Sequence, residues 1–199
     1  MNYKPHIIKN FPEGYPIWKK AVANIIFSIR RIIVFRRENN LTKNDKAEVS
    51  KIMKKGDVIL VGGLRRFSHF FIGDRFTHSL ICEGNKKLIH VVADGVEEVG
   101  LDDIFIEYDT MIVLRPNMDK NIINKAVKYA KAQLGKPYDF EFTKDDNKFY
   151  CAELVQKSFL NAGYKIKYRR KIIYPIDLIE DKFVVKFVSE SLKRSNFLS

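Results

Sequence analysis

A cysteine and two histidines in this chain have the residue types and the spacing that acyl-transfer chemistry requires. Cys151 lies in the run Phe149-Tyr150-Cys151-Ala152-Glu153-Leu154-Val155, after which apolar residues recur at helical spacing as far as Gly163. The pattern predicts a helix that carries Cys151 in its first turn. Because the free N–H groups and dipole of a helix N-terminus stabilise a thiolate, we expect a lowered thiol pKa. The same pattern is also typical of an inert, buried cysteine.

A cysteine nucleophile needs a base, and the base needs a group that orients it. His78 lies in a predicted strand at 76–82, and His90 lies in the next predicted strand, at 87–92. The turn signal Glu83-Gly84-Asn85 would fold these strands side by side and bring the two imidazoles within reach of each other. His78 is therefore a candidate base and His90 a candidate orienting residue. A lone inward-pointing histidine can equally be an ordinary core residue.

The elements that must position these residues predict an α+β fold. Short apolar or alternating runs predict five to six strands in an antiparallel sheet, a meander in outline, at 58–61, 76–82, 87–92, 96–99, 110–115 and 183–188. A helix is predicted from about 120 to 134, capped by Asp119 and stopped by Gly135, and the Cys151 helix follows it. We expect helices packed on this sheet within a domain at 51–199, preceded by a basic helical extension at 1–50.

Residues 17–37 have an amphipathic pattern that leaves two interpretations open. Apolar residues fall on one helical stripe, with most of the basic residues off it: Trp18, Val22, Ile25, Ile26, Ile29 and Ile33. Charged residues interrupt this segment, so its longest uncharged run is far shorter than the roughly 20 apolar residues that a membrane-spanning helix needs. It could pack on the core of the domain, or it could lie on an anionic membrane surface.

Composition limits the classes of protein and partner. The chain has 199 residues and a net charge of +12, and its two cysteines imply no disulfide framework. The histidines and cysteines show no paired spacing typical of zinc, so we expect no metal and no cofactor. Residues 1–56 hold 13 Lys and Arg against 4 Asp and Glu, which favours an anionic partner. No basic recognition helix accompanies this charge, so nucleic acid is not expected. Residues 17–37 lack a secretory signal pattern, so we expect a cytoplasmic protein that can associate with membranes.

Four motifs in order resemble a known family. Lys55-Gly56-Asp57-Val58-Ile59-Leu60, the strand histidine, Gly135-Lys136-Pro137-Tyr138-Asp139 and Tyr150-Cys151-Ala152-Glu153-Leu154-Val155 are similar to circularly permuted NlpC/P60-type papain-like cysteine hydrolases. These include the YiiX-like proteins and, more distantly, the lecithin:retinol acyltransferase group. The resemblance covers about residues 55–180, with Tyr174-Pro175-Ile176-Asp177-Leu178 similar to the tail segment of the family.

The resemblance implies the papain-like fold and a role for each site residue. Cys151 would be the nucleophile, His78 the base that forms a thiolate–imidazolium pair, and His90 the third residue. Tyr138, Tyr150 and Asp57 would be candidate substrate-binding residues. The implied reaction is hydrolysis of an amide, peptide or isopeptide bond through a thioacyl intermediate. Two alternatives stay open: a lipid-directed acyl hydrolase or acyltransferase at an anionic membrane, and a non-catalytic module that binds an anionic partner.

Overall fold

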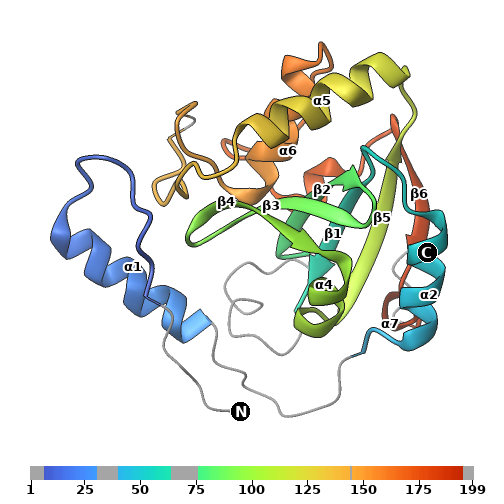
Figure 1. Ribbon diagram of the computed structural model, residues 1–199, viewed down its shortest axis with the longest axis horizontal. Coiled ribbons are helices and arrows are strands. Elements are labelled where there is room, and N and C mark those ends of the chain that lie inside the picture. Colours follow the sequence, from blue (N-terminus) through green and yellow to red (C-terminus); the bar gives the residue numbers. More distant parts are fainter. Residues whose placement is uncertain (1–6, 31–39, 64–75, 144, 195–199) are drawn as a thin grey trace.

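A six-stranded antiparallel sheet forms the centre of the protein (Figure 1). The computed structural model describes residues 7–30, 40–63, 76–143 and 145–194, so the part of the predicted helix beyond Arg30 lies outside the described residues. The strand order is β4-β3-β2-β1-β5-β6, and every neighbouring pair is antiparallel. The strands are β1 (Val58–Gly62), β2 (His78–Gly84), β3 (Lys87–Val92), β4 (Gly95–Gly100), β5 (Thr110–Pro116) and β6 (Phe183–Val188). The predicted α+β class and number of strands are confirmed.

The predicted meander is right for the first four strands and wrong for the fifth. Strand β5 pairs with β1, placing Leu60 opposite Ile112, rather than with β4. Helix α4 (Leu101–Glu107) follows β4 and buries Leu101, Ile104 and Phe105 against the sheet. It thus returns the chain to the free edge of β1. Alternation of apolar and polar residues predicts a strand, but it does not specify the neighbour of that strand.

Helices cover both faces of the sheet. Helices α5 (Lys120–Ala132) and α6 (Cys151–Asn161) pack on the face to which Val58 and Leu60 point. Helices α4 and α2 (Lys43–Ile52) cover the opposite face, to which Ile59 and Val61 point (Figure 1). The alternation of side chains along β1 therefore feeds two separate apolar clusters. A short 3₁₀ helix, η1 (Pro175–Leu178), and α7 (Glu190–Lys193) complete the fold.

One predicted helix end differs in detail from the structure, and another agrees with it. Asp119 occupies the N-cap position of α5, but its side chain makes no capping hydrogen bond. Gly163 follows α6 with a φ of +94°, a left-handed conformation that glycine adopts without the steric cost other residues carry.

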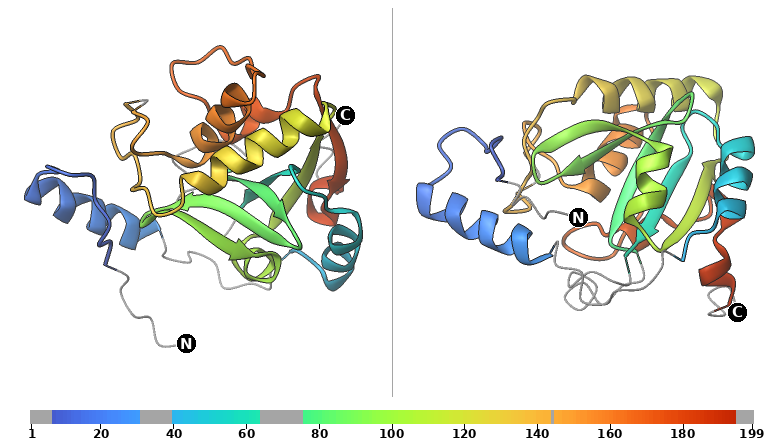
Figure 2. Two further views of the ribbon diagram at one scale, coloured as in Figure 1. Left: turned by 45° about the horizontal axis from the view of Figure 1, so that its top comes forward. Right: turned by 60° about the horizontal axis from the view of Figure 1, so that its bottom comes forward.

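Helix α1 (Ile17–Arg30) stands to one side of the sheet and its covering helices in all views (Figure 2). Of the described α1 side chains only Ala23 is buried, whereas Ile17 and Trp18 are 84% and 66% exposed. As far as residue 26, the large apolar side chains of this helix are therefore not buried in the core. Hydrogen bonding and ion pairing of Asn24 and Lys19 attach the helix to the rest of the protein.

Candidate active site

Cys151 is the first residue of α6 and is partly exposed. The helix start is held by Glu153, whose Oε2 accepts a hydrogen bond from the Tyr150 amide at 3.4 Å. The Tyr150 hydroxyl in turn accepts a bond of 3.2 Å from the amide of Ile173. These contacts come from both sides of the cysteine in the sequence, and they fix the position of the thiol at the helix N-terminus.

Burial raises the pKa of the Cys151 thiol. The backbone amide and hydroxyl of Ser79 and the amides of Ala152 and Cys151 oppose this increase, because they stabilise negative charge on the sulphur. The expected net lowering of the thiol pKa is therefore wrong. The helix N-terminus acts in the predicted direction, but removal of the sulphur from water has the larger effect.

Ser79 is a site residue that the sequence did not reveal. It follows His78 in β2 and is fully buried, and its hydroxyl makes no hydrogen bond of ordinary geometry within the described residues. Ser79 points to the same face of the sheet as Ile81, which belongs to the apolar cluster under α6. A buried hydroxyl directed at a cysteine is available to stabilise a developing thiolate. A polar residue between His78 and the apolar run that starts at Leu80 was the only sequence signal for it.

His78 and His90 contact each other as the paired strands predict. Nε2 of His78 lies 3.0 Å from Nδ1 of His90, and both side chains are buried. The His78 ring also stacks on Tyr108 with a centroid separation of 5.9 Å and an interplanar angle of 4°. The predicted proximity of the two histidines is confirmed.

Glu97 extends this pair into a row of three polar side chains. Its Oε1 lies 3.1 Å from Nε2 of His90, its direct partner across β3 and β4. Since a carboxylate only accepts, His90 donates through Nε2 and accepts at Nδ1. His78 then donates through Nε2, and these hydrogen bonds assign Nδ1 as the basic nitrogen of neutral His78. The Asp94-Gly95 turn joins the two strands, and counting residues outward from this turn in the sequence places Glu97 opposite His90.

The three predicted substrate-binding residues lie in different surroundings. Asp57 is fully buried before β1, with its carboxylate bonded to Arg115 at 2.8 and 2.7 Å. It lies at the other end of β1 from Val61, which pairs with His78. Its burial and ion pair exclude it from contact with a substrate. Tyr150 is 4% exposed and its hydroxyl is engaged by Ile173, so it supports the helix start.

Tyr138 lies at the wall of an open groove of about 360 Å³ beside this site. The groove separates α1 from the segment 138–142, and most of its lining is aromatic or aliphatic: Tyr15, Trp18, Val22, Ala23, Ile26, Tyr138, Phe140 and Phe142. The ring of Phe142 lies 4.9 Å from that of Tyr150, the residue before Cys151. The groove therefore borders the segment that positions the thiol.

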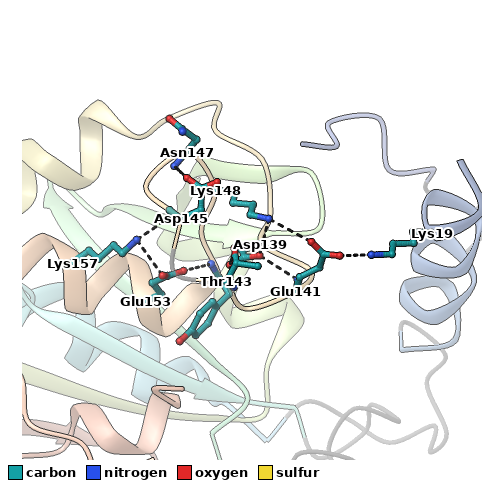
Figure 3. A network of polar contacts seen from close by, with 10 residues as sticks. Lys19, Asp139, Glu141, Thr143, Asp145, Asn147, Lys148, Glu153 and Lys157 are labelled. Atoms are coloured by element: carbon teal, nitrogen blue, oxygen red, sulfur yellow. Dashed lines mark hydrogen bonds and ion pairs between the residues drawn. The ribbon is translucent and has the colours of Figure 1, made fainter. Parts of the chain in front are cut away.

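A network of charged residues holds the loop between the groove and α6 (Figure 3). Buried Asp139 accepts hydrogen bonds from the amides of Glu141 and Thr143, at 3.1 and 2.6 Å. Lys148 lies 3.5 Å from Asp139 and 3.7 Å from Glu141. Figure 3 shows Lys19 of α1 reaching to the other side of Glu141. The loop that precedes Cys151 is thus also the attachment of α1.

The chain is similar to YiiX proteins of Escherichia coli in sequence and in fold. The chain is 43% identical over 49 residues to the uncharacterized protein YiiX of Escherichia coli strain K12, a match that spans 24% of this chain and 24% of that relative. The crystal structure of the metalloprotein YiiX from Escherichia coli O157:H7 has the same fold, with a TM-score of 0.60 and 20% identity. That similarity covers 68% of this chain and 97% of the solved one.

No group of three or more His, Cys, Asp or Glu side chains in the described ranges is arranged to hold a metal ion. Nor is any helix within these ranges long and apolar enough to cross a membrane. The model of the permuted papain-like amidase enzymes YaeF/YiiX, C92 family, matches residues 52–196. This match includes Cys151, His78 and His90 and extends over well more than half of the chain, which therefore belongs to the C92 family of permuted papain-like amidases.

Proposed function

We propose that this protein is a cysteine-dependent acyl hydrolase that cleaves amide bonds, peptide or isopeptide, through a thioacyl intermediate on Cys151. The observation that carries the proposal is the 3.0 Å contact of His78 with His90, in a strand whose next residue, Ser79, lowers the pKa of the Cys151 thiol. The proposal combines a nucleophile at a helix N-terminus with a base and its orienting group. Membership of an amidase family supports the same chemistry. Residues 51–199 would form the catalytic domain.

The protonation states suggest how the first step proceeds. Because burial raises its pKa, the resting thiol of Cys151 is protonated at neutral pH. We therefore assign His78 the role of a general base that removes the thiol proton through Nδ1 as the sulphur attacks the carbonyl carbon. The hydrogen bond to His90 and then Glu97 stabilises the resulting imidazolium. This differs from a thiolate–imidazolium pair that exists before the substrate binds.

The later steps use the same groups. Amides at the helix N-terminus would stabilise the oxyanion of the tetrahedral intermediate. The His78 imidazolium gives its proton to the departing amine, and the carbon–nitrogen bond breaks to leave a Cys151 thioester. His78 then removes a proton from water, which attacks the thioester and releases the acid and the free thiol.

A second candidate substrate is an amide or ester with a long apolar acyl group. The groove that borders Tyr150 favours it, because its lining is apolar apart from Lys19 and Glu141, which pair with each other. This candidate corresponds to the lipid-directed hydrolase or acyltransferase. Chain length separates the two candidates: a short peptide would not fill the groove, whereas a long acyl chain would.

The test is detection of the thioester by intact mass. The protein is incubated with short acyl-peptides, acyl-lysine amides of increasing chain length and phospholipids, then quenched in acid. We expect a mass increase equal to one acyl group that is present in the Cys82→Ser variant and absent in Cys151→Ser. Cys82 is the matched control because it is the other free cysteine and is 1% exposed. Adduct on neither cysteine with the whole panel, together with unchanged substrates, would favour the non-catalytic binding module.

A further inference from the structure

Helix α1 leaves its large apolar side chains exposed. Two polar side chains attach it to the rest of the protein: Asn24 accepts a hydrogen bond of 2.7 Å from the Ile8 amide, and Lys19 pairs with Glu141. The exposed large side chains are apolar: Ile17, Trp18, Val22, Ile25 and Ile26, between 43% and 84% exposed. A surface helix of a globular protein normally has the reverse arrangement, with its apolar stripe on the core. An exposed patch of this kind marks an interaction surface.

The charge around α1 selects the class of partner. Residues 7–30 contain four basic residues, Lys9, Lys19, Lys20 and Arg30, and a single acidic residue, Glu13. The excess continues to residue 56, over which 13 basic residues outnumber 4 acidic ones. A second copy of the chain would bring the same positive charge against α1, so self-association is disfavoured. The partner that fits is both anionic and apolar.

We propose that α1 binds in the interfacial plane of an anionic lipid bilayer. Aliphatic and aromatic side chains on one side of a short helix with basic neighbours are the pattern of such helices. Trp18 has the aromatic type that favours the boundary between headgroups and acyl chains. The segment lies before residue 52, where the family match begins, so the proposal concerns an extension of this chain rather than its catalytic fold.

This orientation would place the groove at the membrane. Trp18, Val22 and Ile26 form one wall of the groove, and Tyr138, Phe140 and Phe142 form the other. A bilayer in contact with α1 would therefore meet the open side of the groove that borders Tyr150. Membrane binding does not depend on catalysis by Cys151, and its test requires no turnover.

Trp18 is the only tryptophan of the chain, so its fluorescence reports on α1 directly. Full-length protein is titrated with vesicles of phosphatidylcholine alone and of phosphatidylcholine mixed with phosphatidylglycerol. We expect a blue shift of emission and co-sedimentation with the mixed vesicles, and binding roughly tenfold weaker to phosphatidylcholine alone. High salt should weaken binding to the mixed vesicles, because screening reduces the attraction of the basic residues.

Matched substitutions locate the surface. Ile25→Asp places a charge on the proposed face, and Ile106→Asp places the same charge on α4 at another exposed isoleucine, which is 69% exposed against 59% for Ile25. Binding should fall roughly tenfold or more for Ile25→Asp and stay unchanged for Ile106→Asp. The proposal is overturned if the native protein shows neither blue shift nor co-sedimentation at low salt, or if both substitutions act equally. A blue shift that depends on protein concentration without vesicles would show self-association through α1 and would also overturn it.

Discussion

Nε2 of His78 lies 3.0 Å from Nδ1 of His90, so the proposed base donates its only proton to the neighbouring ring. The hydrogen bond from His90 to Glu97 fixes this direction, because the carboxylate can only accept. Nδ1 of His78 is left as the basic atom. The proposed mechanism thus depends on a carboxylate two strands away from the strand that carries the base.

Removal of the Glu97 acceptor should slow the reaction without unfolding the protein. We expect Glu97→Ala to lower kcat/KM about tenfold, since His90 would lose the group that fixes its tautomer. Glu97→Gln keeps an acceptor oxygen and should lose less. The melting temperature should stay close to that of the native protein, because the Glu97 side chain is about half exposed.

Glu98→Ala is the control for this prediction. Glu98 is the next residue of β4 and pairs with Lys87 at 2.7 Å across the same two strands, without contact to the imidazoles. Equal loss of kcat/KM in the Glu97 and Glu98 variants would contradict the proposed row of hydrogen bonds.

The two cysteines should differ in reactivity with iodoacetamide. Burial raises the pKa of Cys82 to about 11, and this side chain is 1% exposed in β2. Cys151 is partly exposed, so under native conditions it should be alkylated first, as measured by peptide mass spectrometry. In denaturant the two should react at similar rates. Faster reaction of Cys82 in the native protein would contradict the partly exposed position of Cys151 at the helix N-terminus.

The alkylation rate of Cys151 should rise with pH. Only the thiolate reacts, and the thiol pKa lies above its ordinary value because the sulphur is buried. The thiolate fraction, and with it the rate, therefore increases through the alkaline range rather than reaching a plateau below neutral pH. A plateau in the acidic range would indicate a thiolate–imidazolium pair at rest and contradict the general-base step.

Ser79→Ala should raise the pKa of Cys151 further. The Ser79 hydroxyl lowers this pKa, so its removal should reduce the thiolate fraction and slow alkylation at pH 8 roughly threefold. Ser158→Ala is the matched control: it removes a buried hydroxyl from α6 that is bonded to the Leu154 carbonyl instead. Equal slowing by both substitutions would assign the effect to general loosening of the helix.

Asp57→Asn should affect stability rather than the chemistry. The carboxylate is fully buried and pairs with the half-buried Arg115 guanidinium, so its removal leaves a poorly compensated charge. We expect a loss of about 3 kcal/mol in the free energy of unfolding, measured from denaturant midpoints. The rate of Cys151 alkylation in the folded variant should be unchanged, whereas a substrate-binding role would raise KM without this loss of stability.

The local elements of this protein followed from the sequence because each has a short-range signal. The Lys87–Val92 strand was predicted with its observed bounds, since its apolar run ends at the turn Asp94-Gly95. The contact of His78 with His90 was predictable for the same reason: a short turn joins two strands, and pairing then fixes which side chains meet. The order of motifs indicated the family.

Tertiary structure decided the features that depend on partners distant in the sequence. The Cys151 helix start was predicted, but the raised pKa of the thiol results from burial against β2, which no local pattern encodes. Asp57 was a candidate substrate-binding residue by its sequence position. In the structure Arg115, 58 positions away, pairs with its carboxylate. The apolar stripe of α1 was visible in the sequence, but its exposure depends on how Asn24 and Lys19 attach the helix to residues 16 and 122 positions away. Periodicity shows that a helix has two different sides; only long-range contacts determine which side faces the protein.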